Sequence, residues 1–240
     1  MNRETLFDRA NTDETGLHDT FDWMADRYVD QTVTVSRGRY PGWMIEVAEV
    51  VAQFNPKSIA DVCCGPGYLL YRLQERMPEA DLVGVDYSSR MLEKAPTSIR
   101  TEHRELMEWA RQSDRRFDVI VMTFVLRDQP DPKAVLKALR GRLDGQGHLV
   151  VLETQTPKGW RKPGFHTYFH YWLPWWGERV LASDWPGPSK TAPYRWLSDS
   201  HRVWERKRLI PDAFDHLGYK EIKRYRPQSD VVMVWSAQRG

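Results

Sequence analysis

The stretch Ser58-Ile-Ala-Asp61-Val-Cys-Cys-Gly65-Pro-Gly67-Tyr-Leu-Leu70 decides the fold of this chain. It predicts a short buried strand, a glycine turn and the start of a helix. The segment Asp81-Leu-Val-Gly-Val-Asp86 predicts a second strand that ends in an acid. This order is the layout of a nucleoside site in a doubly wound sheet, because glycine lets the backbone approach a ligand and the acid accepts ribose hydroxyls.

The spacing of the motif narrows the kind of nucleoside. A dinucleotide fingerprint has glycine at its first, third and sixth positions, and Leu70 stands at the sixth position from Gly65. Asp61 lies four residues before Gly65. The full pattern resembles the S-adenosylmethionine (SAM) signature of class I methyltransferases, which implies SAM as the cofactor and disfavours an NAD-dependent oxidoreductase. A glycine-rich turn with two ordinary helix caps is the alternative.

Length and composition predict a single α/β domain over residues 1–240. Hydrophobic residues make up 41% of the 240 positions and the net charge is +2, so a sizeable core is possible and nucleic acid is not an expected partner. We expect neither a signal peptide nor a membrane-spanning helix. Cys63 and Cys64 are adjacent and cannot form an ordinary disulfide, which favours a cytoplasmic location. We interpret them as small apolar residues where strand meets turn.

Hydrophobic periodicity divides the chain into three parts. Residues 1–55 predict a helical arm, with helices from Leu17 and over 43–54. Alternating strands and helices follow, which indicates a parallel sheet with right-handed crossovers. The expected strands lie at about 58–62, 81–85, 98–102, 117–123 and 148–153, and the expected helices at 67–76, 88–95, 103–111 and 131–143.

The pattern changes after Glu153. Residues 154–204 contain seven of the eleven tryptophans and no strand period, which indicates a helical insertion rather than a linker. A helix over 211–217 and a hairpin of 219–226 with 230–236 complete the chain. The predicted fold is therefore a Rossmann-like, doubly wound, mostly parallel seven-stranded sheet. It carries a C-terminal antiparallel hairpin, an N-terminal helical arm and a Trp-rich insertion after the fifth strand.

Further stretches resemble the ubiquinone/menaquinone C-methyltransferase family. Phe21-Asp-x-x-Ala25-x-x-Tyr28, Ser36-x-Gly38 and Trp43 resemble its N-terminal arm, and Thr123-Phe-Val-Leu-Arg127-Asp128 resembles its Phe-Gly-Leu-Arg-Asn stretch. Leu149-Val-Val-Leu-Glu153, Leu173-Pro174 and Tyr194-Arg195-Trp196-Leu197 also match, so the resemblance covers about residues 20–238. Two positions depart from the family: Asp128 replaces an asparagine, and His103 stands where an Asp or Asn meets the adenine.

The resemblance implies methyl transfer from SAM to a ring carbon of a quinol or related phenol. Arg127 is expected to stabilise the developing oxyanion and Asp128 to accept its proton. A purely structural turn role for this pair, ahead of Pro130, is the alternative. The implied cofactor contacts are Tyr28, Asp61, Cys63, Gly65, Gly67, Asp86, Tyr87, Met91, His103, Thr123 and Phe124.

His166 and His170 are four residues apart, but no glutamate follows His166, so a metal site is not expected. We interpret His170 as a candidate base or quinol-orienting donor, because histidine titrates near neutrality. The alternative is an ordinary residue of an aromatic belt.

The crowded aromatics of residues 154–204 predict a lid that carries the acceptor pocket at the carboxyl edge of the sheet. The alternative is a satellite core that packs the N-terminal arm. The same composition suits the inner face of a membrane, so a peripheral membrane contact stays open, as does a homodimer. Two further functions also stay open: an O- or C-methyltransferase of specialised metabolism, and a SAM-binding scaffold without methyl transfer. The predicted substrate contacts are Tyr171, Trp172, Trp175, Trp176 and Tyr194.

Overall fold

The computed structural model describes residues 14–112, 115–187, 192–207, 210–227 and 230–240. The chain begins with helices α2 (Glu14–Met24), α3 (Tyr28–Val35) and α4 (Tyr40–Ala52). The alternating region follows: β1 (Ser58–Val62), α5 (Tyr68–Arg76), β2 (Asp81–Asp86), α6 (Ser89–Leu92), β3 (Arg100–His103), α7 (Leu106–Gln112), β4 (Phe117–Thr123), the short 3-10 helix η1 (Leu126–Asp128), α8 (Pro132–Gly141) and β5 (Leu143–Thr154). The last elements are α9 (Arg161–Thr167), the π-helix η2 (Tyr168–Trp172), α10 (Leu173–Val180), α11 (Pro193–Lys207), α12 (Asp212–His216), β6 (Tyr219–Tyr225) and β7 (Val232–Arg239).

The seven strands form one sheet in the order β3-β2-β1-β4-β5-β7-β6. Strands β1 to β5 pair in parallel, and β7 runs antiparallel to both β5 and β6. The order reverses direction between β1 and β4, which is the switch point where ligands bind in such sheets. The doubly wound, mostly parallel fold with its antiparallel hairpin is confirmed.

Some predicted boundaries differ from the structure. The first helix of the arm is divided into α2 and α3. Strand β5 begins at Leu143 rather than His148, because Leu143 pairs with Phe117 before a register shift in the β4–β5 ladder. Residues 228–229, which belong to the predicted hairpin turn, lie outside the described residues.

The two faces of the sheet bury different side chains, because successive residues of a strand point in opposite directions. In β4, Ile120 and Met122 pack in the cluster that contains side chains of α7, α8 and α12. Val119 and Val121 pack in the cluster that contains side chains of α4 and α5. Burial on both faces explains why β4 is a continuous apolar run.

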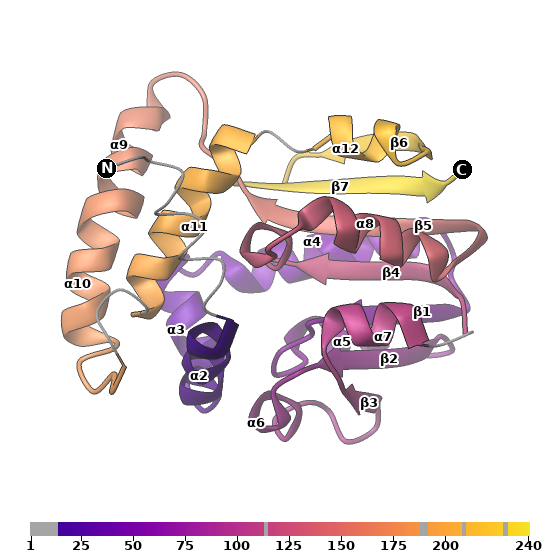
Figure 1. The fold of residues 1–240 in the computed structure, drawn as a ribbon, viewed down its shortest axis with the longest axis horizontal. Coiled ribbons are helices and arrows are strands. Elements are labelled where there is room, and N and C mark those ends of the chain that lie inside the picture. The colour runs from indigo at the N-terminus through magenta and orange to yellow at the C-terminus, as the bar shows by residue number, and fades with distance from the viewer. Residues whose placement is uncertain (1–13, 113–114, 188–191, 208–209, 228–229) are drawn as a thin grey trace.

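Helices α9, α10 and α11 stand together beyond the edge of the sheet toward which β4 and β5 point (Figure 1). Phe169, Leu173 and Tyr194 form a third, smaller core, and Trp23 and Val35 of the N-terminal arm pack against it. Hydrogen bonds reinforce this contact: Gln31 Nε2 donates to the Leu181 carbonyl at 2.8 Å, and the Tyr168 hydroxyl donates to the Val35 carbonyl at 2.8 Å. Insertion and arm therefore pack together over the carboxyl edge.

Across the described residues, no helix is both long enough and apolar enough to cross a bilayer.

Candidate active site

Two strained residues mark the switch point of the sheet. Cys63 follows β1 with φ +55°, and Phe124 follows β4 with φ +61°. Side chains other than glycine rarely occupy this left-handed region, and such strain gathers at functional sites. Both residues line a cavity of about 520 Å³, a volume in the usual range of small-molecule sites. We call it the inner cavity.

Asp86 anchors the inner cavity at the tip of β2. Its side chain is buried, and its two carboxylate oxygens accept the backbone N–H groups of Gly65 at 2.8 Å and Ser88 at 2.9 Å. Burial raises the pKa of this carboxyl, although the two N–H groups oppose the shift. Gly65 has φ +55°, and a Cβ added there would meet no atom within 4 Å. The glycine turn therefore presents open backbone beside an oriented acid, as a bound nucleoside requires.

The N-terminal arm closes the other side of the inner cavity. The His18 ring stacks on Tyr87 with ring centroids 3.9 Å apart, and His18 also approaches Glu105 at 3.3 Å. Asp22 accepts a hydrogen bond from the Ser88 hydroxyl. Phe21 and Tyr28 of the arm also line the cavity. Aromatic faces of this kind suit both an adenine ring and a sulfonium cation.

Eight of the predicted cofactor residues line the inner cavity: Tyr28, Cys63, Gly65, Asp86, Tyr87, Met91, Thr123 and Phe124. Burial raises the pKa of both Cys63 and Cys64, so the thiols stay neutral as expected for small apolar residues.

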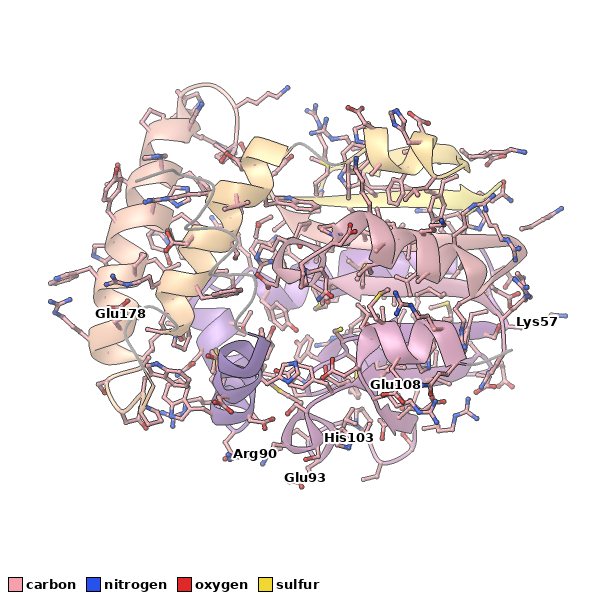
Figure 2. All side chains as sticks on the ribbon, in the orientation of Figure 1. Lys57, Arg90, Glu93, His103, Glu108 and Glu178 are labelled. Carbon is pink, nitrogen blue, oxygen red and sulfur yellow. The ribbon has the colours of Figure 1, made fainter. Side chains whose placement is uncertain are left out.

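The structure places the other three predicted cofactor residues elsewhere. Asp61 lies within β1 opposite Gly84, and both of its oxygens are buried without a hydrogen-bond partner among the described residues. A Cβ at Gly67 would lie 2.7 Å from Pro96, so this position needs glycine for packing against Pro96. Gly67 is not among the residues that line the inner cavity. His103 is exposed, and its Nε2 lies 2.6 Å from the Tyr87 carbonyl oxygen (Figure 2).

Several residues of the inner cavity were not predicted. Leu106 and Met107 line it because the chain turns back over β2 after β3 ends, and their place directly after a strand was the available signal. His18 lies on the same amphipathic helix as Phe21, three residues earlier. The remaining unpredicted lining residues are Glu105, Arg111, Val125, Gln129, Pro130, Asp131, Ala134, Val135 and Trp196.

A second cavity of about 530 Å³ adjoins the first, and we call it the outer cavity. The two cavities share Phe21, Tyr28, Phe124, Asp128 and Trp196 as lining residues, so they meet at these side chains. Aromatic and aliphatic residues from the arm and the insertion form much of its wall: Met24, Val35, Trp43, Phe165, Tyr168, Phe169, Leu173, Tyr194 and Leu197.

A buried ionic cluster lies at the junction. The Arg127 guanidinium contacts Glu153 at 2.6 Å and Asp128 at 3.4 Å, and all three side chains are buried. The Arg127 Nε–H is buried and has no hydrogen-bond partner among the described residues, and Arg127 is one of the residues that line the outer cavity. Since Arg127 is already paired with two carboxylates, a further negative charge would only partly be compensated there.

Asp128 is a buried carboxylate that lines both cavities. Its Oδ1 accepts the Trp196 indole N–H at 3.1 Å, which fixes the carboxylate between the two cavities. Burial raises the pKa of Asp128, opposed by Arg127 and reinforced by Glu153. A carboxylate with a raised pKa binds a proton more readily at neutral pH, as a general base requires. Desolvation also raises the pKa of Tyr28 to about 12, so its hydroxyl remains a donor.

The predicted role of His170 does not fit its position. His170 lines neither cavity; its Nδ1 lies 3.0 Å from the Ser198 hydroxyl and accepts from Arg202 Nε at 3.2 Å. Burial, with His201 and Arg202 nearby, lowers its pKa to about 3. The ring therefore packs within the insertion as a neutral group and is not among the residues that line the two cavities.

The predicted substrate residues divide by helix face. Tyr194 lines the outer cavity, and its hydroxyl donates to Gln31 at 2.9 Å. Tyr171, Trp172 and Trp175 are exposed and line neither cavity, while Trp176 packs against the small third core. The insertion does supply the wall of the outer cavity, but through other residues of α9, η2 and α10, namely Phe165, Tyr168, Phe169 and Leu173.

The inner cavity fits SAM. It offers the Asp86 carboxylate as a candidate partner for ribose hydroxyls, an open glycine turn and aromatic walls, in a volume suited to a small-molecule ligand. Among solved structures, the chain resembles the plantazolicin methyltransferase BpumL bound to S-adenosylhomocysteine (TM-score 0.60, 14% identity, 98% of this chain and 100% of the other). It also resembles human N-acetylserotonin methyltransferase bound to SAM (TM-score 0.55, 12% identity, 87% and 54%). Fold and site together define a class I SAM-dependent methyltransferase.

The sequence comparisons narrow this class. The sequence model of the ubiE/COQ5 methyltransferase family matches residues 9–238, so the chain belongs to that family. Demethylmenaquinone methyltransferase of Bacillus cereus is 26% identical over 220 residues, which cover 88% of this chain and 90% of the relative. The protein of the same name from Listeria monocytogenes is 24% identical over 224 residues, covering 89% and 91%.

Proposed function

We propose that this methyltransferase acts on a ring carbon of a quinol or related phenol whose apolar part occupies the outer cavity. The observation that carries the proposal is the junction of the two cavities, where Asp128 and Arg127 meet an aromatic wall. The relatives named demethylmenaquinone methyltransferase support the same acceptor class. An apolar cavity with a few convergent polar groups suits a ring that carries hydroxyls.

The residues at the junction match the needs of this reaction. SAM, when bound, would supply an electrophilic methyl group, which a nucleophile attacks in line with the departing sulfur. Asp128 takes the proton of a ring hydroxyl, and the positive charge of Arg127, which lines the outer cavity, stabilises the resulting oxyanion. The neighbouring ring carbon then forms its bond to the methyl group as the sulfur–carbon bond breaks. Loss of that carbon's own hydrogen restores the aromatic ring, and one proton is released overall.

Tyr28 and Phe124 contribute in a different way. Both line the inner and the outer cavity, so their rings flank the path between sulfonium and acceptor. A cation near an aromatic face is stabilised by about 0.5–2 kcal/mol. The closed apolar wall also excludes water, which would compete for the base and for the acceptor hydroxyl.

The proposal is tested by product analysis. The protein is incubated with SAM carrying a deuterated methyl group and with a panel of demethyl-quinols and simple phenols. We expect labelled product from the quinols, with tandem mass spectrometry placing the label on a ring carbon. Label on oxygen would replace the proposal with O-methylation, and SAM binding without any product would support a scaffold.

Asp128→Asn tests the base directly. The substitution keeps the shape and the acceptor oxygen for Trp196, and it restores the residue expected in the family. We expect the methyl-transfer rate to fall by about 10²-fold or more, with SAM affinity little changed. A rate equal to that of the unaltered protein would show that Asp128 only forms hydrogen bonds. Arg127→Ala is a poorer test, because it leaves the buried Glu153 carboxylate without its ion-pair partner.

A further inference from the structure

The outer side of the insertion carries aromatic residues that the outer cavity does not use. Helices α9, η2 and α10 follow one another without a gap from Arg161 to Val180. Phe165, Phe169 and Leu173 point inward to the small third core. On the other side the exposed fraction is 61% for Tyr171 and 55% for Trp175. We call this the outer aromatic face; its exposed residues are Trp160, Tyr171, Trp172 and Trp175.

Arginines accompany the aromatic rings of this face. Arg161 lies over the Trp160 ring at 5.3 Å, Arg179 over Trp175 at 5.0 Å and Arg202 over Tyr171 at 5.7 Å. The rings are therefore held beside cations while their edges stay exposed. Aromatic residues next to Arg and Lys are the composition of helices that lie in the interface of a bilayer.

The charge of residues 158–180 also favours a membrane surface as the partner. Residues 158–180 contain four basic residues, Lys158, Arg161, Lys162 and Arg179, against the single acid Glu178. That acid is neutralised by Arg195, whose Nε lies 2.8 Å from its carboxylate. With four basic residues and one acid, the segment has a formal net charge of +3, whereas the chain as a whole has +2. Such a segment is attracted to an anionic lipid surface.

The mouth of the outer cavity opens beside this face. Three exposed arginines are among the residues that line the cavity: Arg37 and Arg39 from the turn before α4, and Arg161 from α9. Arg161 therefore joins the mouth to Trp160 of the outer aromatic face, and it also pairs with Asp230, another residue of the cavity lining, at 3.2 Å. In Figure 2, side chains project from α9 and from α10, which carries Glu178, away from the rest of the molecule.

We propose that the outer aromatic face and the arginine-lined mouth form one docking surface for an anionic phospholipid bilayer. Trp160, Tyr171, Trp172 and Trp175 enter the boundary between headgroups and acyl chains, and the arginines contact lipid phosphates. An apolar acceptor dissolved in the bilayer then reaches the outer cavity without crossing water. Binding of the surface to lipid does not depend on which acceptor is methylated.

Co-sedimentation with vesicles tests this surface. Vesicles of phosphatidylcholine alone are compared with vesicles that also contain phosphatidylglycerol, at low and high salt. We expect binding to the anionic vesicles, weakened by salt, and a loss of about tenfold or more in Tyr171→Ser/Trp175→Ser. Both side chains are exposed, and unchanged SAM affinity in calorimetry would show that the variant is folded.

Tyr71→Ser is the matched control. Tyr71 on α5 is 46% exposed and has Arg72 over its ring at 5.2 Å, but it lies outside the docking surface. We expect its vesicle binding to equal that of the unaltered protein. The proposal is overturned if anionic vesicles do not bind, or if the two variants bind equally. A dimer in sedimentation that only Tyr171→Ser/Trp175→Ser dissociates would assign the face to a second copy of the chain instead.

Discussion

The two glycines of the turn after β1 have different tasks at the scale of single residues. Gly65 has open space where a Cβ would stand and lines the inner cavity, whereas a Cβ at Gly67 would lie 2.7 Å from Pro96. Both have positive φ, so alanine at either site carries about 1 kcal/mol of backbone strain.

We therefore expect Gly65→Ala to weaken SAM binding by about tenfold or more, with only a modest loss of stability. Gly67→Ala should instead lower the free energy of unfolding by about 2 kcal/mol or more, because Pro96 and Ala95 must move. Calorimetry with SAM and urea denaturation separate the two effects. The assignment fails if Gly65→Ala binds SAM normally.

The buried Asp61 carboxyl should make the free energy of unfolding depend on pH. Burial, reinforced by Asp86, raises the pKa of this unpartnered carboxyl well above its ordinary value. At pH values between the pKa of Asp61 in the unfolded chain and its higher pKa in the folded chain, the folded protein binds more protons than the unfolded chain. The free energy of unfolding is therefore retained at low pH and falls as the pH rises through the folded pKa.

Asp61→Asn removes this titration. In the ligand-free protein, the fall in stability from about pH 5 to about pH 8 should become smaller. A part of the fall should remain, since the pKa values of Asp86 and Asp128 are raised as well. Urea denaturation at several pH values measures the slope. An identical slope in both proteins would show that Asp61 does not titrate in this range.

At the scale of elements, the approach of α10 to Tyr194 shapes the outer cavity. A Cβ at Gly177 would lie 2.5 Å from the Tyr194 ring, and Tyr194 is held by its hydrogen bond to Gln31. Gly177→Ala should therefore displace Tyr194, raise KM for the acceptor and leave SAM affinity unchanged.

Gly164→Ala provides the control for this substitution. Gly164 is also helical and lines the same cavity, but a Cβ there would meet no atom within 4 Å. It should keep the acceptor KM and gain up to about 1 kcal/mol of stability from alanine's helix propensity. Equal KM values in the two variants would argue against a role of Tyr194 in the acceptor site.

In the insertion, the density of aromatic residues was predictable from the sequence, but the direction in which each side chain points was not. Phe165, Phe169 and Leu173 recur every four residues, and so do Tyr171 and Trp175. Both sets are apolar, so periodicity does not select the inner face. Tertiary contacts select the inner face. The Tyr168 hydroxyl donates a hydrogen bond to the Val35 carbonyl of the arm, and the absence of a side chain at Gly177 lets the Tyr194 ring pack against α10.

At the scale of the whole molecule, the alternation of strands and helices was sufficient to predict the sheet. The acid at the tip of β2 and the turn after β1 also predicted the part of the inner cavity that Asp86 and Gly65 line. The opposite wall was only partly predictable, because α2 and α3 reach it across long sequence separations. The Asp22–Ser88 hydrogen bond and the His18–Tyr87 stack, which join α2 to the residues after β2, form only in the folded chain.

We expect the inner cavity to hold SAM and the adjoining outer cavity to hold the acceptor ring. A crystal structure with S-adenosylhomocysteine and a methylated quinone tests this arrangement most directly. We expect ribose hydroxyls on Asp86, and the ring methyl facing the sulfur where Tyr28, Phe124, Asp128 and Trp196 meet. A quinone ring bound away from this junction, or adenosine away from Asp86, would contradict the account.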